Sequence, residues 1–145
     1  MSRIDDGFAT TIEFASQASG TGPTLTFWEK EITPPGMDAG GENDTTTMRN
    51  TLYRTKAAKK LITMTPMTLV VSYDAAFYDD IIDMIGDNQL ITITFPDEST
   101  LAFYGWLDKF VPGNIVEGEQ PTANVEIVCG NQNAAGAETA PDYEA

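Results

Sequence analysis

The sequence contains no histidine and only one cysteine among its 145 residues. Without histidine, the chain lacks the usual general base of a serine or cysteine triad and the commonest side-chain ligand of transition metals. A single cysteine permits no intramolecular disulfide. No apolar run approaches the length of a membrane-spanning helix, and residues 1–5 lead into no signal-peptide core. We therefore expect a soluble protein that stays in the cytoplasm after synthesis and contacts no membrane.

Positive charge is also scarce, because 8 basic side chains face 22 acidic ones and the formal net charge is −14. This balance excludes a general nucleic-acid binder, which needs Lys and Arg to neutralise phosphates, and an anionic membrane surface as partner. No Asp or Glu occurs between Thr45 and Tyr73. Five of the eight basic residues lie in that acid-free stretch: Arg49, Arg54, Lys56, Lys59 and Lys60. We expect this basic segment to meet an acidic surface, and the nearest such surface is another copy of the chain.

Short stretches of alternating apolar and polar residues predict β-strands. The expected strands cover residues 7–14, 24–32, 67–73, 89–95, 100–111 and 122–130. Between the second and third of these lies a long connection, in which 44–49 and 61–65 could form ribbon strands. The central part, residues 51–60, is compatible with either a helix or an extended conformation.

One helix is expected, over residues 74–86. Asp74 can cap its first N–H groups, and Gly86 can end it. The residues spaced for one apolar stripe are Phe77, Ile81, Met84 and Ile85. Many short strands with one helix predict a mostly β protein, an antiparallel β-sandwich or barrel with one flanking α-helix and a long extended loop.

The length predicts one domain with a real core. We expect an N-terminal arm over 1–6, a β domain over 7–130 that contains the loop 36–60, and a disordered acidic tail over 131–145. Within the domain, no constellation predicts catalysis, and we expect no enzyme and no cofactor. Cys129 shares its strand face with apolar residues, which favours a buried small side chain over a nucleophile. The acidic groups Asp38, Glu42 and Asp44 lack the spacing of a calcium loop, and Asp79, Asp80 and Asp83 are typical of a solvated helix face.

Three motifs in a fixed order carry a resemblance to a known family. They are ITPPGM at 32–37, DTTTM at 44–48 after an acid-bearing glycine loop, and LVVSYDAAFY at 69–78. Over roughly residues 8–130 the chain resembles the major tail tube proteins of long-tailed, non-contractile bacteriophages. In that family a β-barrel or sandwich flanked by one helix forms hexameric rings, which stack into the tube through which DNA leaves the capsid.

The resemblance implies a virion protein of the phage tail, made in the cytoplasm of the host bacterium. Its implied partners are other copies of itself, the tail tip initiator, the tape-measure protein and the tail terminator, while DNA passes without specific binding. The five basic residues would form an inter-ring loop. Candidates for an acidic channel lining, which repels phosphates, are the strand carboxylates Glu13, Glu29, Glu31, Asp108 and Glu126; ordinary solvated faces explain each of them equally well.

Two other readings stay open from the sequence. A secretion-tube ring protein of the haemolysin-coregulated type would share the ring architecture without long stacking. A monomeric β-sandwich binding module would use an aromatic side chain, Trp28 or Trp106, to stack on a ligand such as a carbohydrate.

Overall fold

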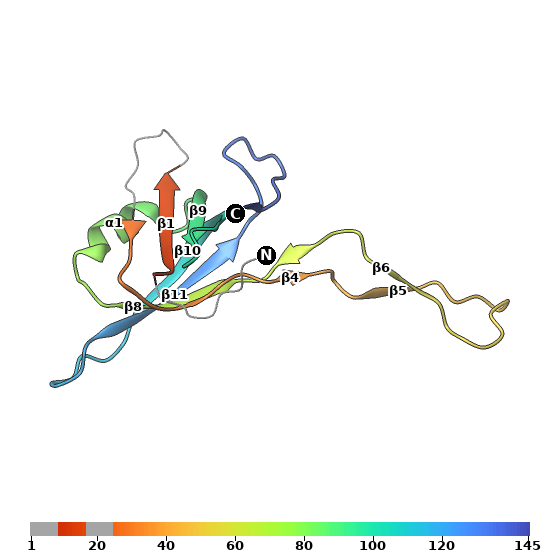
Figure 1. Cartoon of the computed structure of the whole chain (residues 1–145), viewed down its shortest axis with the longest axis horizontal. Coiled ribbons are helices and arrows are strands. Elements are labelled where there is room, and N and C mark those ends of the chain that lie inside the picture. Colours follow the sequence, from red (N-terminus) through yellow and green to blue (C-terminus); the bar gives the residue numbers. More distant parts are fainter. Residues whose placement is uncertain (1–8, 17–24) are drawn as a thin grey trace.

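The computed structural model describes residues 9–16 and 25–145, so the expected N-terminal arm over 1–6 lies outside the described residues. In the described part the protein is mostly β, every strand pairing is antiparallel, and one short helix flanks the sheet. The predicted fold class is confirmed, with an open strand order in place of a closed barrel. Figure 1 shows a body of sheet and helix from which a long two-stranded ribbon projects to one side.

The body contains one 8-stranded sheet with the order β2-β1-β9-β10-β11-β8-β3, and β12 pairs with β10 outside this path. In chain order these strands are β1 (Thr11–Ser16), β2 (Leu25–Thr26), β3 (Glu29–Thr33), β8 (Met67–Ser72), β9 (Gln89–Thr94), β10 (Thr100–Pro112), β11 (Thr122–Cys129) and β12 (Asp142–Glu144). The predicted strands over 89–95, 100–111 and 122–130 match β9, β10 and β11 closely. The strand expected over 24–32 corresponds to β2 and β3, with residue 24 outside the described residues. Of the strand expected over 7–14, residues 7 and 8 also lie outside them, and the strand β1 covers Thr11–Ser16.

The long strand β10 joins two halves of the sheet. Its first part pairs with β9 and its second part with β11, and the change takes place at Gly105, which is in register with both strands. A Cβ on Gly105 would lie 2.3 Å from the carbonyl oxygen of Val128, a distance that real contacts do not show. A β-bulge follows between Leu107 and Lys109. Because a bulge adds one residue to one strand, Leu107 and Phe110 both face the interior although their spacing is odd.

Strand β3 also contains a β-bulge. Its register with β8 shifts between Glu29 and Glu31, so that Phe27 and Ile32, five residues apart, both pack on the core. A regular alternation would have placed Glu29 and Glu31 on the same face as Phe27. The bulge therefore separates two carboxylates that the sequence pattern had grouped together.

The core lies between the two halves of the sheet and beneath the helix. Phe27 occupies its centre: its ring meets Phe14 at 5.9 Å and Phe77 at 5.2 Å in edge-to-face contacts, and it stacks on Phe110 at 6.4 Å. These rings come from four separate parts of the chain, β1, the segment after β2, α1 and β10. Aromatic pairs in such geometries add roughly 0.5–1.5 kcal/mol each beyond the area they bury, so Phe27 ties the helix to both halves of the sheet.

The helix α1 covers Phe77–Met84, shorter than the predicted 74–86. Asp74 does not cap the helix as predicted, because the helix begins three residues later than expected and its N-cap is Ala76, which makes no side-chain capping hydrogen bond. Asp74 Oδ1 instead accepts a hydrogen bond from the Ala76 amide at 3.0 Å, ahead of the helix. Gly86 follows the helix with a φ of +80°, a conformation that suits glycine. The buried stripe is Phe77, Ile81 and Met84; Ile85, predicted to share it, is 48% exposed because the helix ends before it. No helix in the described ranges is long and apolar enough to cross a membrane.

The C-terminal segment differs from the expected disordered tail over 131–145. Gln132 and Glu138 form an isolated bridge, and β12 pairs with Thr100–Ala102 at the start of β10. The composition is poor in apolar residues, but backbone hydrogen bonds to a free sheet edge require no apolar side chain. The last part of this segment, β12, is thus part of the sheet.

Candidate assembly surfaces

The ribbon that projects from the body, residues 36–65, is called the arm. It contains two short antiparallel pairs, β4 (Met37–Asp38) with β7 (Thr63–Met64) and β5 (Glu42–Asp44) with β6 (Lys56–Ala58). At its base the Gly36 amide donates to Thr65 Oγ1 at 2.8 Å, and the Thr65 amide donates to the Gly36 carbonyl at 2.9 Å. The segment 51–60, undecided from the sequence, contains an extended strand and no helix. Figure 1 shows that the arm reaches well beyond the body.

The arm tip, residues 45–55, is held by its own polar groups. The Thr45 amide donates to the Thr55 carbonyl at 2.9 Å and closes the loop. Asn50 braces the interior: its Oδ1 accepts from the Thr47 amide at 3.0 Å, and its Nδ2 donates to the Tyr53 carbonyl at 2.9 Å. Turn residues thus satisfy the backbone locally, and the tip side chains are left to point outward.

The five basic residues of the arm fall into two groups. Lys56 pairs with Glu42 at 2.9 Å and Arg54 with Asp44 at 3.5 Å, both across the ribbon. Asp44 also accepts a hydrogen bond from the Thr46 amide, and the hydrogen bonds from Thr46 lower the pKa of its carboxyl. In the part of the chain that the structure describes, no ion pair joins Arg49, Lys59 or Lys60. The charges of these three cations are therefore not neutralised by an ion pair within the described residues.

Sequence reasoning stressed the charge of the arm and missed its apolar side chains. Met48 is fully exposed, and Leu52, Tyr53 and Leu61 are more than 80% exposed. Met37 and Ile62 at the arm base are also exposed. Large apolar groups concentrated on one projecting element mark an interaction site. The feature of the sequence that could have indicated these exposed apolar side chains is their position inside a long stretch without Asp or Glu.

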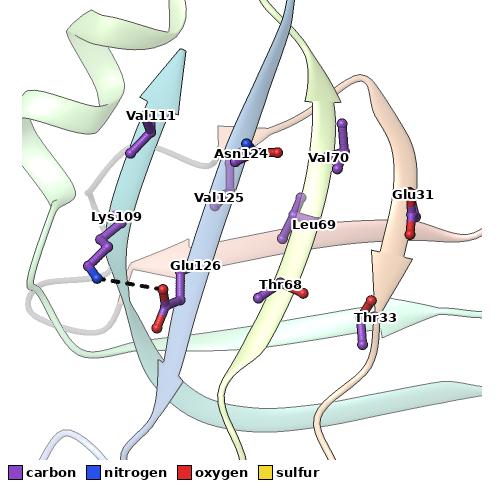
Figure 2. Close-up of a pocket in the computed structure, with 10 residues that line it drawn as sticks. All are labelled: Glu31, Thr33, Thr68, Leu69, Val70, Lys109, Val111, Asn124, Val125 and Glu126. Atoms are coloured by element: carbon purple, nitrogen blue, oxygen red, sulfur yellow. Dashed lines mark ion pairs between the residues drawn. The ribbon is translucent and has the colours of Figure 1, made fainter. Parts of the chain in front are cut away.

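A second surface is the outer face of β10, β11, β8 and β3. The strand register aligns two rows of side chains across it: Lys109, Glu126, Thr68 and Thr33 form one, and Val111, Asn124, Val70 and Glu31 form the other. These side chains line a hollow of about 260 Å³. Figure 2 shows them on the four neighbouring strands. Lys109 Nζ lies 3.8 Å from Glu126 Oε2, the one ion pair drawn there.

The structure places the five channel-lining candidates in different positions. Glu31 and Glu126 lie on this one outer face, two strands apart. Asp108 is exposed at the bulge of β10, and Glu13 lies on the other half of the sheet, in register with Thr92. Glu29 is directed elsewhere, because its Oε1 accepts a hydrogen bond from the Ile12 amide at 3.1 Å and so ties β3 to β1. The five candidates therefore lie on more than one part of the sheet.

The acidic groups considered as metal ligands have structural partners. Asp38 Oδ1 accepts from the Gly40 amide at 2.8 Å, while Glu42 and Asp44 bind Lys56 and Arg54. Among the described residues no group of three or more possible ligands could hold a metal ion. Cys129 is half-buried, and burial raises the pKa of its thiol to about 11, the opposite of what activates a nucleophile.

The two tryptophans considered for ligand stacking lie apart. Trp28 is 68% exposed at the start of β3, and Trp106 is partly buried against Gly130, where a Cβ would lie 2.7 Å from its ring. Neither lines the hollow on the outer face of β10, β11, β8 and β3. An exposed single ring is an ordinary surface feature.

Comparison with solved structures shows what the fold is similar to. The chain matches a chain in the cryo-EM structure of the anti-feeding prophage baseplate, six-fold symmetrised, with a TM-score of 0.67 and 9% identity over 99% of this chain and 97% of that one. It also matches a chain in the tail of an empty gene transfer agent particle with C6 symmetry (TM-score 0.64, 11% identity, 97% and 99% covered) and one in the native particle (0.63, 10%, 97% and 99%). No protein-family description and no curated protein sequence matches the chain. The chain therefore has the fold found in subunits of phage-like tail and baseplate particles.

Proposed function

We propose that this chain is a structural subunit of a bacteriophage tail tube that forms hexameric rings, stacks them, and conducts DNA through an acidic channel during ejection. The observation that carries the proposal is the arm, a hydrogen-bonded ribbon that extends away from the body and exposes large apolar side chains and unpaired cations. In a monomer the apolar side chains of the arm stay exposed to water, which stabilises nothing; they are buried only when another molecule covers the arm. The likeness to chains in six-fold tail and baseplate particles supports the proposal.

In this proposal the arm bridges neighbouring rings. Arg49, Lys59 and Lys60 meet acidic surface on another copy, while Met48, Leu52 and Tyr53 are buried there. Exposed ion pairs are worth only about 0–1 kcal/mol each, so charge sets the register and apolar burial supplies the affinity. One acidic surface of suitable character is the outer side of α1, where Tyr78 and Ile82 are exposed beside Asp79 and Asp83.

The channel lining proposed is the outer face of β10, β11, β8 and β3. Its carboxylates Glu31 and Glu126 repel phosphates, and Lys109 is held by Glu126 rather than left free for DNA. Threonine and asparagine side chains between them are polar without positive charge. Such a face avoids the phosphate contacts that would slow a passing duplex.

The remaining parts of the proposal follow from the same assembly. The protein is a non-enzymatic component of the virion tail, with itself as main partner and the tail tip initiator, tape-measure protein and tail terminator at the ends of the tube. It is synthesised in the host bacterium.

Negative-stain electron microscopy of the purified full chain, dilute and then concentrated, tests the proposal. Hollow tubes of stacked rings are the expected result, with or without seeding by tail tips. The triple variant Arg49→Glu, Lys59→Glu, Lys60→Glu should keep the circular dichroism spectrum of the folded protein. It should remain monomeric and form no tubes in the micrographs. Lys30→Glu, which reverses a cation outside the arm, is the control and should assemble normally.

Other outcomes separate the alternatives. Single rings that never stack would favour a secretion-tube ring protein of the haemolysin-coregulated type. A protein that stays monomeric with seeds and binds a glycan array through Trp28 would favour a binding module. Normal tubes from the triple variant would remove the arm cations from the assembly.

A further inference from the structure

A groove of about 800 Å³ lies where the arm leaves the body, between the arm base and the C-terminal segment. Its arm-side wall carries the exposed apolar side chains of Met37, Leu61 and Ile62. The opposite wall is made of residues 130–132, 136 and 138–141, which include two glycines, an alanine and a proline. Lys60 lines the groove on the arm side, and Glu138 lines it on the other. The arm-side wall therefore offers apolar groups and a cation, which fits an insert that brings apolar side chains and carboxylates to that wall, away from Glu138.

The β10–β11 hairpin tip, residues 113–121, has this character. Ile115 is 71% exposed and Val116 is 51% exposed, and both precede the carboxylates Glu117 and Glu119. No Lys or Arg follows Lys109 in the sequence. The tip is also constrained, because the Gly113 amide donates to the Thr122 carbonyl at 2.8 Å and the Glu119 amide to the Val116 carbonyl at 3.3 Å. A pre-organised loop loses little conformational entropy when it binds.

The groove and the tip lie on opposite sides of the body. In Figure 1 the hairpin tip forms the lower left extremity, and the arm leaves the body toward the right. The tip therefore cannot fill the groove of its own chain, but a second copy displaced along the long axis can present its tip to it. A contact between two different surfaces of the same chain is heterologous, and its repetition builds rings or open filaments.

We propose that the β10–β11 hairpin tip of one copy docks in the groove at the arm base of the next copy, with Ile115 and Val116 against Leu61 and Ile62 and the tip carboxylates toward Lys59 and Lys60. This interface rests on the proposed assembly and adds a second contact to the one made by the arm tip. The arm tip itself is a poorer occupant of the groove, because Arg49 and Arg54 would lie beside Lys60. The acidic tip has the opposite charge, which favours it.

Disulfide trapping between two single-cysteine proteins tests the contact. In a Cys129→Ser background, one full-length protein carries Ile115→Cys, and the other carries Leu61→Cys or Ile62→Cys. The two are mixed at concentrations that form tubes, oxidised mildly, and analysed by non-reducing electrophoresis. Docking should make the mixed dimer form at least about tenfold faster than a control pair, because it raises the effective concentration of the two thiols.

The control pair combines the same groove cysteine with Trp28→Cys, since Trp28 is 68% exposed, close to the 71% of Ile115, and lies on neither the arm nor α1. Tubes that form without tip-to-groove dimers at either groove position would overturn the docking and leave the tail tube proposal standing. Monomers that neither cross-link nor form tubes with seeds would overturn both. Selective mixed dimers without tubes would support the docking and count against the tube.

Discussion

Lys56 Nζ lies 2.9 Å from Glu42 Oε1 across the arm, although the strand register places Lys56 opposite Asp44. Asp44 instead forms an ion pair with Arg54 at 3.5 Å and accepts a hydrogen bond from the Thr46 amide. Two of the arm's cations therefore act within the arm, where they hold its two strands together. This division explains why Lys56 is a poor choice for testing contacts between copies, and it yields a prediction about the arm itself.

Lys56→Glu should loosen the arm without unfolding the body. Like charges would then face each other across β5 and β6, but an exposed pair contributes only about 0–1 kcal/mol, so the melting temperature should fall by less than about 3 °C. Amide hydrogen exchange of Thr45, whose N–H donates to the Thr55 carbonyl, should become faster. The double variant Glu42→Lys, Lys56→Glu restores opposite charges and should return the exchange rate toward that of the original protein. An unchanged Thr45 rate in the single variant would contradict the role given to this pair.

Phe27→Ala should be among the most destabilising single substitutions. Phe27 is 4% exposed and touches rings from β1, α1 and β10, so its loss leaves a cavity that three elements would have to fill. Loss of a buried Phe ring typically costs about 3–5 kcal/mol in the free energy of unfolding, measured by urea titration. The adjacent Trp28→Ala is a matched control, because its larger ring is 68% exposed and its loss should cost less than about 0.5 kcal/mol. Equal effects of the two would mean that Phe27 is not central to the core.

Glu31→Lys with Glu126→Lys should turn the proposed channel lining into a DNA-binding surface. The double variant should form tubes that retain DNA in a filter-binding assay, with an affinity that falls steeply as salt rises, because counterion release governs phosphate contacts. Asp142→Lys with Glu144→Lys makes the same change in charge on β12, and these tubes should retain much less DNA. If both variants retained DNA equally, the outer face of β10, β11, β8 and β3 would not be the lining.

Cys129 should react slowly in the folded protein. Its thiol pKa is about 11 because burial disfavours the thiolate, so alkylation at pH 8 should be about two orders of magnitude slower than in urea. The folded pKa is above the unfolded one, so the folded state binds this proton more tightly. The resulting stability is fully present below the unfolded pKa, roughly 8.5, and is lost as the pH rises toward 11. Alkylation equally fast with and without urea would show that the thiol is open to solvent.

The sequence by itself determined the local elements. Alternation located β9, β10 and β11 within one or two residues, because each strand has one face on the core and one outside. Apolar spacing located α1, and Gly86 predicted where it ends, because few residues other than glycine accept a φ of +80°. The lack of acid between Thr45 and Tyr73 also indicated the arm as a separate surface.

Tertiary structure decided which residues share a surface. Alternation grouped Glu29 with Glu31, but the bulge in β3 separated them and gave Glu29 to the Ile12 amide. Glu31 and Glu126 are far apart in sequence and lie on one face only because β8 pairs with both of their strands. Strand parity fixes faces within a strand, whereas neighbours, bulges and register depend on contacts across the whole fold. The segment 142–144 has little apolar surface to bury, so its own sequence does not predict a strand. It forms β12 because it pairs with the edge of β10, a contact that depends on the whole fold.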